Sequence, residues 1–357
     1  MAMEIRTLNI NEVHAVIRHV KPRTRLFTSK LFTNFHQSQF DVVHLDHIPV
    51  ETDLAAPIVS PHLPGVPVRL EGTRTLTLTP SYVRLQTPVE PAGLFDPAEN
   101  RAAYVLEGDL MKRHGEARRL TIEKHVRMIE NRWEMMAAEA AISGRLTIES
   151  DGVPVSTVDF GRDPSLTITK TAGAYWGDTG VSVLEDLEAM LSMVHDASGV
   201  RPTFGLLGKN VAAHVRRQAR QDGELKDLMD TRFGTDGTSI TRGLSEPGEV
   251  RPVGSISGLV DLYEYSQTFR YQRNDKSIAT FKPLGDNEIA LFADDIIGIQ
   301  AFGAIKNLAG QYAARPIFGR NYIQEGTPQM EVVAHESAPI MIPGAPNRTL
   351  KATVLGV

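Results

Sequence analysis

Three kinds of short stretch in the sequence bring together residue types that could do chemistry. A Gly-Leu-Leu-Gly-Lys run at 205–209 has the glycines and the lysine of a phosphate-binding loop, in which backbone N–H groups and a lysine hold phosphate oxygens. His44 and His47 are separated by two residues, a spacing that could hold a metal ion if a third ligand came from elsewhere. Adjacent carboxylates occur at Glu185–Asp186 and at Asp294–Asp295.

None of these stretches meets the requirements of the chemistry that it suggests. The run at 205–209 is too short for a phosphate cradle and is followed by Asn210 where a metal-binding hydroxyl belongs. Neighbouring side chains on a strand or helix point apart, so the carboxylate pairs are expected to be caps or solvated faces. The two histidines are expected on a solvated arm. The sequence has no nucleophile elbow and no metalloprotease helix signature. We therefore expect no catalytic residue, no metal and no cofactor.

Composition narrows the function classes further. The 357 residues carry a net charge of −5, which argues against a general nucleic-acid-binding protein because such proteins need clustered Lys and Arg. The absence of cysteine excludes disulfides and thiolate metal sites and fits folding inside a cell. No apolar run of about 18 residues is present, so no membrane span is expected. The N-terminus lacks the apolar core of a signal peptide.

The element that must position the rest is a long helix, predicted from Gly115 to Gly144. Apolar residues at steps of three and four form one continuous stripe, made of Ile122, Val126, Ile129, Trp133, Met136 and Ala140. Charged residues are expected on the opposite face, at Glu123, Lys124, Arg127, Glu130 and Glu134. Gly144 fits a left-handed C-cap. Gly115 is expected to separate this helix from one that starts at Asp96 and runs to about Arg113.

Residues 1 to about 36 are basic in an acidic chain. A short helix is expected there, with Asn11 as its N-cap and an apolar face made of Val13, Val16, Ile17 and Val20. This helix either packs on its own domain or belongs to an arm that lies on a neighbouring subunit. The arm contacts to acidic neighbours are expected from Arg18, Lys21, Arg23 and Arg25.

Between Phe40 and Phe95 the sequence has eight prolines and no convincing helix. Alternation at 66–70 and 75–79, around a turn at 71–73, predicts a two-stranded hairpin. An isolated hairpin is only marginally stable in water, and its unpaired edges need a partner. We therefore expect the hairpin to lie on another copy of the protein, which it contacts through Arg69, Glu71, Arg74 and Arg84.

The remainder predicts a layered α/β unit followed by returning strands. Helices are expected at 183–198 and 210–221 around a buried strand at 202–207. Further strands are expected at 259–265, 270–281 and 288–292, and a hairpin with an Asp-Gly turn at 146–160. The last strands, between 324 and 355, are expected to rejoin the sheet beside the long helix.

Four motifs, which occur in order along nearly the whole chain, resemble the lambda-type family of tailed-phage major capsid proteins. They are Ala56-Pro57-Ile58-Val59-Ser60, Thr79-Pro80-Ser81-Tyr82-Val83, Ala197-Ser198-Gly199-Val200 and Glu336-Ser337-Ala338-Pro339-Ile340-Met341. The resemblance implies an α+β Hong Kong 97-type shell fold. Its expected parts are an N-terminal arm (1–45), an extended hairpin loop (46–94), a peripheral domain with a spine helix (95–179), an axial domain (180–318) and strands returning to the peripheral domain (319–357).

The resemblance also implies a function, that of a major capsid protein which self-assembles as hexamers and pentamers into an icosahedral head shell around phage double-stranded DNA. The expected partners are portal, scaffolding and decoration proteins and nonspecifically contacted DNA, without a membrane. The expected location is the virion, after assembly in the bacterial host cytoplasm. Some such shells are locked by lysine–asparagine cross-links, but no lysine occurs between Lys30 and Lys112. A loop lysine cross-link is therefore impossible, and stabilisation is expected to be noncovalent or to come from a decoration protein.

Two other functions fit parts of the sequence. One is a cargo-enclosing shell protein of the same fold, which would need no portal, scaffold or decoration partner. The other is an α/β hydrolase or nucleotide-binding enzyme built on the middle region. A deep pocket with convergent titratable groups near Gly208 would support the second function.

Overall fold

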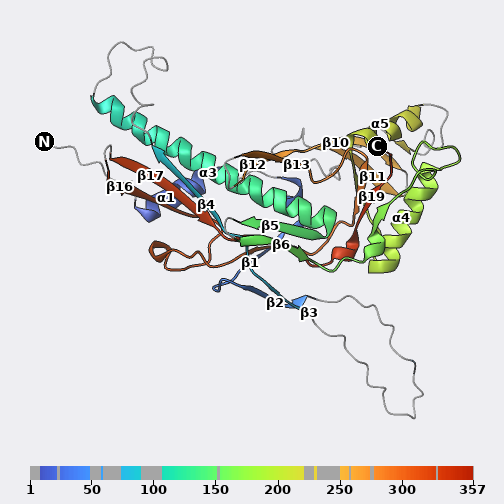
Figure 1. Ribbon diagram of the computed structural model, residues 1–357, viewed down its shortest axis with the longest axis horizontal. Coiled ribbons are helices and arrows are strands. Elements are labelled where there is room, and N and C mark those ends of the chain that lie inside the picture. Colours follow the sequence, from blue (N-terminus) through green and yellow to red (C-terminus); the bar gives the residue numbers. More distant parts are fainter. Residues whose placement is uncertain are drawn as a thin grey trace.

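The computed structural model describes residues 9–21, 25–48, 58, 74–89, 107–150, 153–220, 229–230, 250–256, 259–273, 277–326 and 329–356. The molecule is elongated, and its longest helix, α3 (Glu107–Ser143), lies along it (Figure 1). One end carries α1 (Ile10–His19). The other end carries α4 (Val183–Ser198) and α5 (Lys209–Arg220).

The described strands form one large sheet and several small ones. The large sheet has the order β7 (Thr167–Thr169), β19 (Thr349–Thr353), β14 (Glu288–Phe292), β8 (Phe204–Leu207), β11 (Val260–Tyr265), β10 (Val250–Ile256), β9 (Met229–Asp230). One three-stranded sheet has the order β16 (Phe318–Gln324), β17 (Met330–Ser337), β4 (Val83–Val89). A second has the order β1 (Asn34–Gln37), β15 (Gly298–Phe302), β18 (Pro339–Pro343). Three strand pairs are β2 (Val43–Ile48) with β3 (Arg74–Leu78), β5 (Arg145–Ser150) with β6 (Val153–Asp159), and β12 (Phe269–Gln272) with β13 (Ile278–Phe281). Short helical turns are η1 (Phe27–Leu31), η2 (Pro164–Leu166), η4 (Leu308–Gly310) and η5 (Pro346–Arg348).

Helix α3 is continuous through Gly115, so the prediction of a break there is wrong. A Cβ added at Gly115 would meet nothing within 4 Å, and a single glycine weakens a helix by only about 1 kcal/mol without ending it. The predicted helix start at Asp96 lies outside the described residues. The predicted C-terminus is confirmed, because the helix ends at Ser143 and Gly144 follows with φ +66° and donates its N–H to Ala140 O at 3.0 Å.

The two halves of α3 are covered differently. The first half buries a stripe that includes Ile122 and Val126 against Val13, Val89 and Val333. The second half is buried nearly all round, and the partly buried Trp133 packs edge-on against Phe302 with 5.0 Å between ring centroids. The predicted stripe is confirmed, since Ile122, Val126, Ile129, Met136 and Ala140 are all buried. Glu134 is predicted on the charged face opposite the stripe, but it is 1% exposed, because residues 27–28 cover it and donate hydrogen bonds to its carboxylate.

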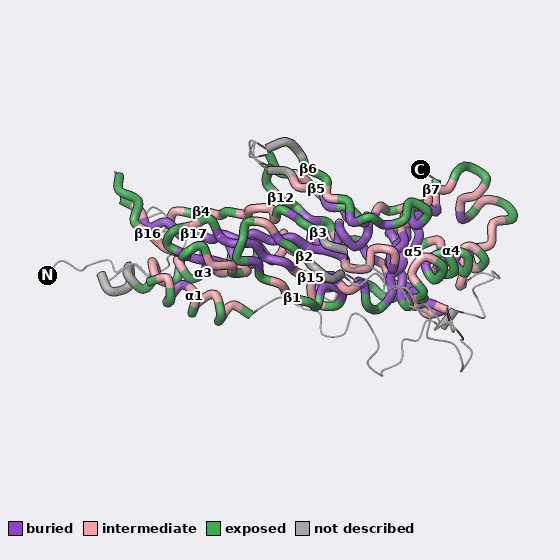
Figure 2. Tube along the Cα trace, turned by 90° about the horizontal axis from the view of Figure 1, so that it is seen from below, coloured by how far each residue is buried: buried purple, intermediate pink, exposed green. Residues whose placement is uncertain are grey.

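The large sheet separates two hydrophobic clusters because its strands alternate. Leu207, Leu262 and Ile289 face a cluster that includes α4 and α5, whereas Leu206, Tyr263 and Ala290 face the cluster that holds the end of α3. Buried residues follow the strands along the length of the molecule (Figure 2). The predicted return of the last strands is correct for β18, which packs on α3. Strand β19 also contacts α3, and it pairs with β14 and β7 in the large sheet.

Helix α1 packs on its own subunit. Its N-cap is Asn9 rather than Asn11, and the Asn9 N–H donates to Glu12 Oε2 at 2.9 Å in a capping box. Val13 is fully buried against the α3 cluster. The first of the two alternatives for this helix is therefore the observed one.

The two glycines at the limits of the originally predicted helix should respond oppositely to substitution. Gly115→Ala should raise the free energy of unfolding by roughly 0.5–1 kcal/mol, because alanine loses less backbone entropy in a helix. Gly144→Ala should lower it by about 1–2 kcal/mol, since φ is positive and the new Cβ would lie 3.0 Å from Arg162 Cβ. Urea unfolding of the soluble subunits measures both changes. Equal effects of the two substitutions would contradict the continuous helix.

Candidate assembly surfaces

The extended loop is carried by a two-stranded stem. Strands β2 and β3 pair antiparallel, with Val43 opposite Leu78 and Ile48 opposite Arg74. The base of the stem is anchored, because Val43 is fully buried and Leu78 is 8% exposed in the same cluster as Phe302. Beyond its base the stem projects from the body (Figure 1), and within the described residues no third strand pairs with either of its edges.

The predicted hairpin partner of residues 75–79, at 66–70, lies outside the described residues, as do Arg69 and Glu71. In the part of the chain that the structure describes, β3 pairs with β2, which the sequence pattern did not identify as its partner. Arg74 lies at the end of β3, where only its backbone is described. These three residues therefore stay predicted loop contacts.

Arg84 contacts a buried carboxylate of its own chain. It lies on β4 directly opposite Glu336 of β17, with 3.4 Å between Arg84 Nε and Glu336 Oε1. Glu336 is 1% exposed and also accepts hydrogen bonds from the Tyr82 hydroxyl and from Asn307 Nδ2, the latter at 2.8 Å. Burial, reinforced by Glu336, raises the pKa of Tyr82 to about 12. The Arg84 side chain is still half-exposed. Its contact with a neighbouring subunit therefore stays a prediction.

The predicted arm residues do not behave alike. Arg18 and Lys21 are exposed, and Arg23 lies outside the described residues. Arg25 is 3% exposed and donates from Nη2 to Asn131 Oδ1 of α3 at 2.5 Å. The prediction that Arg25 contacts a neighbour is therefore wrong, because α3 of the same subunit covers it.

Glu134 holds the N-terminal segment at residues 27–28 against α3. This role was not predicted from the sequence. The Glu134 carboxylate accepts hydrogen bonds from the N–H groups of Phe27 and Thr28, both at 2.9 Å, and from Thr28 Oγ1 at 2.7 Å. Burial raises its pKa, and the donors from Thr28 and Phe27 oppose that shift. The sequence does indicate that Glu134 is buried. The run from Trp133 to Ile142 is apolar almost all round, which is typical of a helix segment buried on every side.

Two buried histidines join α3 to β17. His125 and His335 approach with 3.0 Å between their Nδ1 atoms, and His125 Nε2 lies 2.8 Å from Thr87 Oγ1 of β4. They are 3% and 0% exposed. Burial lowers the pKa of His125 to about 4. Burial, helped by His125 and His14, lowers the pKa of His335 to about 3. Both rings are therefore neutral near pH 7.

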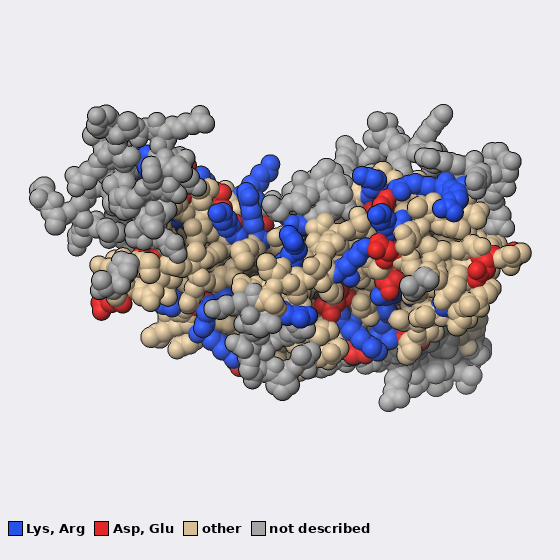
Figure 3. Space-filling view, turned by 45° about the horizontal axis from the view of Figure 1, so that its top comes forward, with Lys and Arg blue, Asp and Glu red and all other residues tan. Residues whose placement is uncertain are grey.

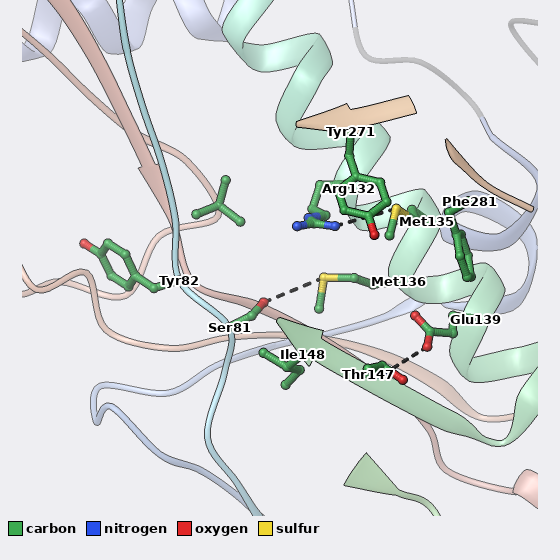
Figure 4. Close-up of a pocket in the computed structure, with 11 residues that line it drawn as sticks. Ser81, Tyr82, Arg132, Met135, Met136, Glu139, Thr147, Ile148, Tyr271 and Phe281 are labelled. Atoms are coloured by element: carbon green, nitrogen blue, oxygen red, sulfur yellow. Dashed lines mark hydrogen bonds between the residues drawn. The ribbon is translucent and has the colours of Figure 1, made fainter. Parts of the chain in front are cut away.

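A recess of about 250 Å³ lies between α3, the start of β4, β5 and the β12–β13 pair (Figure 4). Its polar groups already have partners within the chain. The Arg132 guanidinium lies over the Tyr271 ring at 5.1 Å, Glu139 accepts the Thr147 N–H at 3.0 Å, and the Ser81 hydroxyl donates to Pro339 O at 2.9 Å. The recess therefore offers shape and apolar area and no set of groups poised for catalysis.

The stretches that suggested chemistry have structural roles. A Cβ at Gly208 would lie 2.1 Å from Gly285 O, so the glycine permits close backbone packing and leaves no space for a phosphate. Asp186 binds Lys170 and accepts from Trp176 Nε1 at 2.9 Å. His44 bonds to Thr77 Oγ1 at 3.1 Å. Within the described ranges, no group of three or more His, Asp or Glu side chains could hold a metal ion, and no helix is long and apolar enough to cross a membrane.

The histidine pair predicts a loss of stability in mild acid. The unfolded chain takes up protons near pH 6.5, whereas the folded pair resists them until pH falls to about 4. Stability should therefore fall as pH drops from 6.5, by roughly 1.4 kcal/mol per pH unit for each histidine. The free energy of unfolding, measured at pH 7 and pH 5, should show a shallower dependence in His335→Gln than in the wild type. The exposed His19→Gln is the matched control, and equal pH dependence in all three proteins would contradict the assignment.

The comparisons with known proteins agree over nearly the whole chain. The profile of the family described as Phage major capsid protein E matches residues 9–354. The major capsid protein of Escherichia phage lambda is 24% identical over 337 residues, covering 90% of this chain and 92% of the relative. The major capsid protein of Enterobacteria phage P21 is 26% identical over 324 residues, covering 87% of each chain.

Solved structures show the same fold. A capsid protein of a prophage of E. coli CFT073 superposes with a TM-score of 0.72 at 18% identity, covering 98% of this chain and 99% of the other. A phage-related protein from Bordetella bronchiseptica RB50 superposes with a TM-score of 0.51 at 12% identity, covering 99% of each chain. The fold is thus the Hong Kong 97-type shell fold that the sequence motifs implied. The protein is a structural component of a phage head shell and not an enzyme. It belongs to the phage major capsid protein E family.

Proposed function

We propose that this capsid subunit closes its shell through the extended loop, whose connection at residues 49–73 packs on a neighbouring copy. The observation that carries the proposal is the β2–β3 stem, which is anchored at Val43 and Leu78 and has no further strand on either edge in the described part of the chain. A two-stranded stem is only marginally stable alone in water. A neighbour that covers its edges and side chains stabilises it.

An exposed apolar side chain in the connection supports this role. Ile58 is fully exposed in the subunit. Burying an isoleucine side chain contributes roughly 1.5–3 kcal/mol. A residue of this type is expected in a segment that is covered only after assembly.

Ion pairs are proposed to set the register between neighbours. On the arm, the exposed Arg18 and Lys21 face acidic surfaces of a neighbour. On the loop, Arg69 and Arg74 pair with carboxylates of the neighbour, Glu71 also contacts it, and Arg84 is shared between Glu336 and the neighbour. Each exposed pair contributes only about 0–1 kcal/mol. Weak contacts repeated by symmetry close a shell while single errors stay reversible.

We further propose how the subunit is divided and what it meets. The seven-stranded sheet with α4 and α5 forms the axial domain at 180–318, joined by β7 and β19, and α3 with β17 and β18 belongs to the peripheral domain. The subunits form hexamers and pentamers in the host cytoplasm with scaffolding and portal proteins, and they enclose DNA contacted nonspecifically. Because the loop lacks lysine, the shell is held noncovalently or by a decoration protein.

The loop is tested by shortening it without disturbing its anchor. Residues 50–72 are replaced by a short Gly-Ser turn, which retains β2, β3 and the buried Leu78. The subunits should stay soluble, with an unchanged unfolding midpoint, and should form no closed shells in negative-stain microscopy. Normal shells from this variant would end the proposal.

A matched pair of point substitutions tests the exposed isoleucine, Ile58. Ile58→Ser should raise the subunit concentration needed for half-assembly about tenfold, which corresponds to about 1.4 kcal/mol. Ile278→Ser is the control, because Ile278 is also an exposed isoleucine, at 73%, and lies on β13 outside the loop. An equal effect of both substitutions would show that general surface hydrophobicity, and not the loop contact, drives assembly.

A further inference from the structure

The two helices on the large sheet carry opposite charge. Helix α4 contains four acidic residues and no Lys or Arg, and α5 contains four Lys or Arg residues and no acidic residue. Both helices pack on the same face of the seven-stranded sheet. In Figure 3, Lys and Arg side chains gather over α5 at this end of the molecule. One end of each subunit therefore presents an acidic helix and a basic helix.

The charges form matching stripes on the exposed sides of these helices. On α4, Glu185, Glu188 and Asp196 are exposed, while Leu187, Leu191 and Val194 are buried. On α5, Lys209 and Arg217 are exposed, while Val211 and Val215 are buried. Glu188 and Asp196 are eight residues apart, as are Lys209 and Arg217, so each pair spans about 12 Å along its helix axis. The two stripes can therefore pair charge for charge.

Among the residues that the structure describes, few partners are found for these charges. Asp186 pairs with Lys170, and Arg216 pairs with Glu264 at 2.6 Å. Among the described residues no ion pair involves Glu188, Lys209 or Arg217, and Asp196 has only the adjacent His195 at 3.7 Å. No ion pair joins α4 to α5 within the described chain. Both stripes are therefore available to a partner.

Helix stability does not explain two of these charges. Lys209 is the first residue of α5 and Asp196 lies in the last turn of α4. A cation at a helix N-terminus and an anion at a C-terminus oppose the helix dipole, each at a cost of roughly 0.3–1 kcal/mol. Helix stability alone therefore does not account for the presence of Lys209 and Asp196.

We propose that α5 of one copy lies against α4 of the next copy, head to tail, around each ring of the shell. The partner is a second copy of this chain because each subunit carries both complementary stripes. A head-to-tail contact between unlike surfaces closes into a ring when the rotation between neighbours closes. A recess of about 270 Å³ beside Glu188 is lined by Leu191, Pro202 and Leu259 and also by Ser192 and Arg201. Its three apolar side chains can cover the stem of an incoming lysine or arginine. This inference rests on the proposed assembly of the subunit into rings.

Charge reversal tests the interface through recombination of variants. Lys209→Glu/Arg217→Glu and Glu188→Lys/Asp196→Lys should each raise the concentration for half-assembly at least about tenfold, because each places like charges in contact. Combining the four substitutions in one chain should restore closed shells. Lys124→Glu/Arg127→Glu, which reverses the same two types of exposed charge on α3, is the control and should assemble nearly as the wild type does. Unfolding midpoints of all soluble subunits exclude misfolding.

A mixture of the two reversed proteins gives a sharper readout. In a head-to-tail ring with an even number of subunits, the two proteins can alternate so that every contact is attractive. A ring of five subunits cannot alternate in this way. The mixture should therefore form six-membered rings, sheets or tubes, seen by negative stain, in place of closed shells with pentamers. If neither the mixture nor the fourfold variant assembles better than the separate proteins, the interface is wrong. If the wild type itself forms no shells, the proposed function fails, and this interface fails with it.

Discussion

The structure depends on the burial of the second half of α3. From Glu134 to Ile142 the helix has no fully solvated side, so other elements must cover it from several directions at once. Strand β18, the β5 strand and the η1 turn do this. The Glu134 carboxylate then binds the Phe27 and Thr28 N–H groups, which ties the η1 turn to the helix. A buried carboxylate is costly unless its lone pairs are satisfied, and here three donors satisfy it.

The first half of α3 is held in a different way and by fewer residues. Strand β17 runs beneath it and alternates, so that Glu331, Val333 and His335 all face the helix. Glu331 lies 3.3 Å from Arg118, Val333 packs on Ile122, and His335 meets His125. Strand β4 pairs with β17 and also contacts α3 through Thr87 and His125, so the positions of the helix and of the two strands are coupled. Strand β4, which follows the loop in the chain, and the helix are therefore parts of one unit.

The sequence was informative where one periodic pattern decided the outcome. The apolar stripe of α3, the α4 and α5 helices and the Gly144 cap follow from spacing and from glycine geometry. The predicted helix break at Gly115 was wrong because it gave one residue too much weight. The helix continues through this glycine because it is stabilised on both sides of it. Prediction also failed where partners are distant in sequence. Nothing local indicates that β3 pairs with β2, that β19 joins β14, or that Glu134 faces Phe27, because these contacts are chosen by tertiary packing.

The length of α3 has a mechanical consequence. At about 1.5 Å per residue, its 37 residues make a rod of about 55 Å. Since its C-terminal half is clamped in the core, about half of that length extends beyond the clamp, and a rotation of about 5° at the clamp displaces the far end by roughly 2–3 Å. The helix is thus a lever. A small angular change near the core therefore becomes a larger displacement at the far end of the helix.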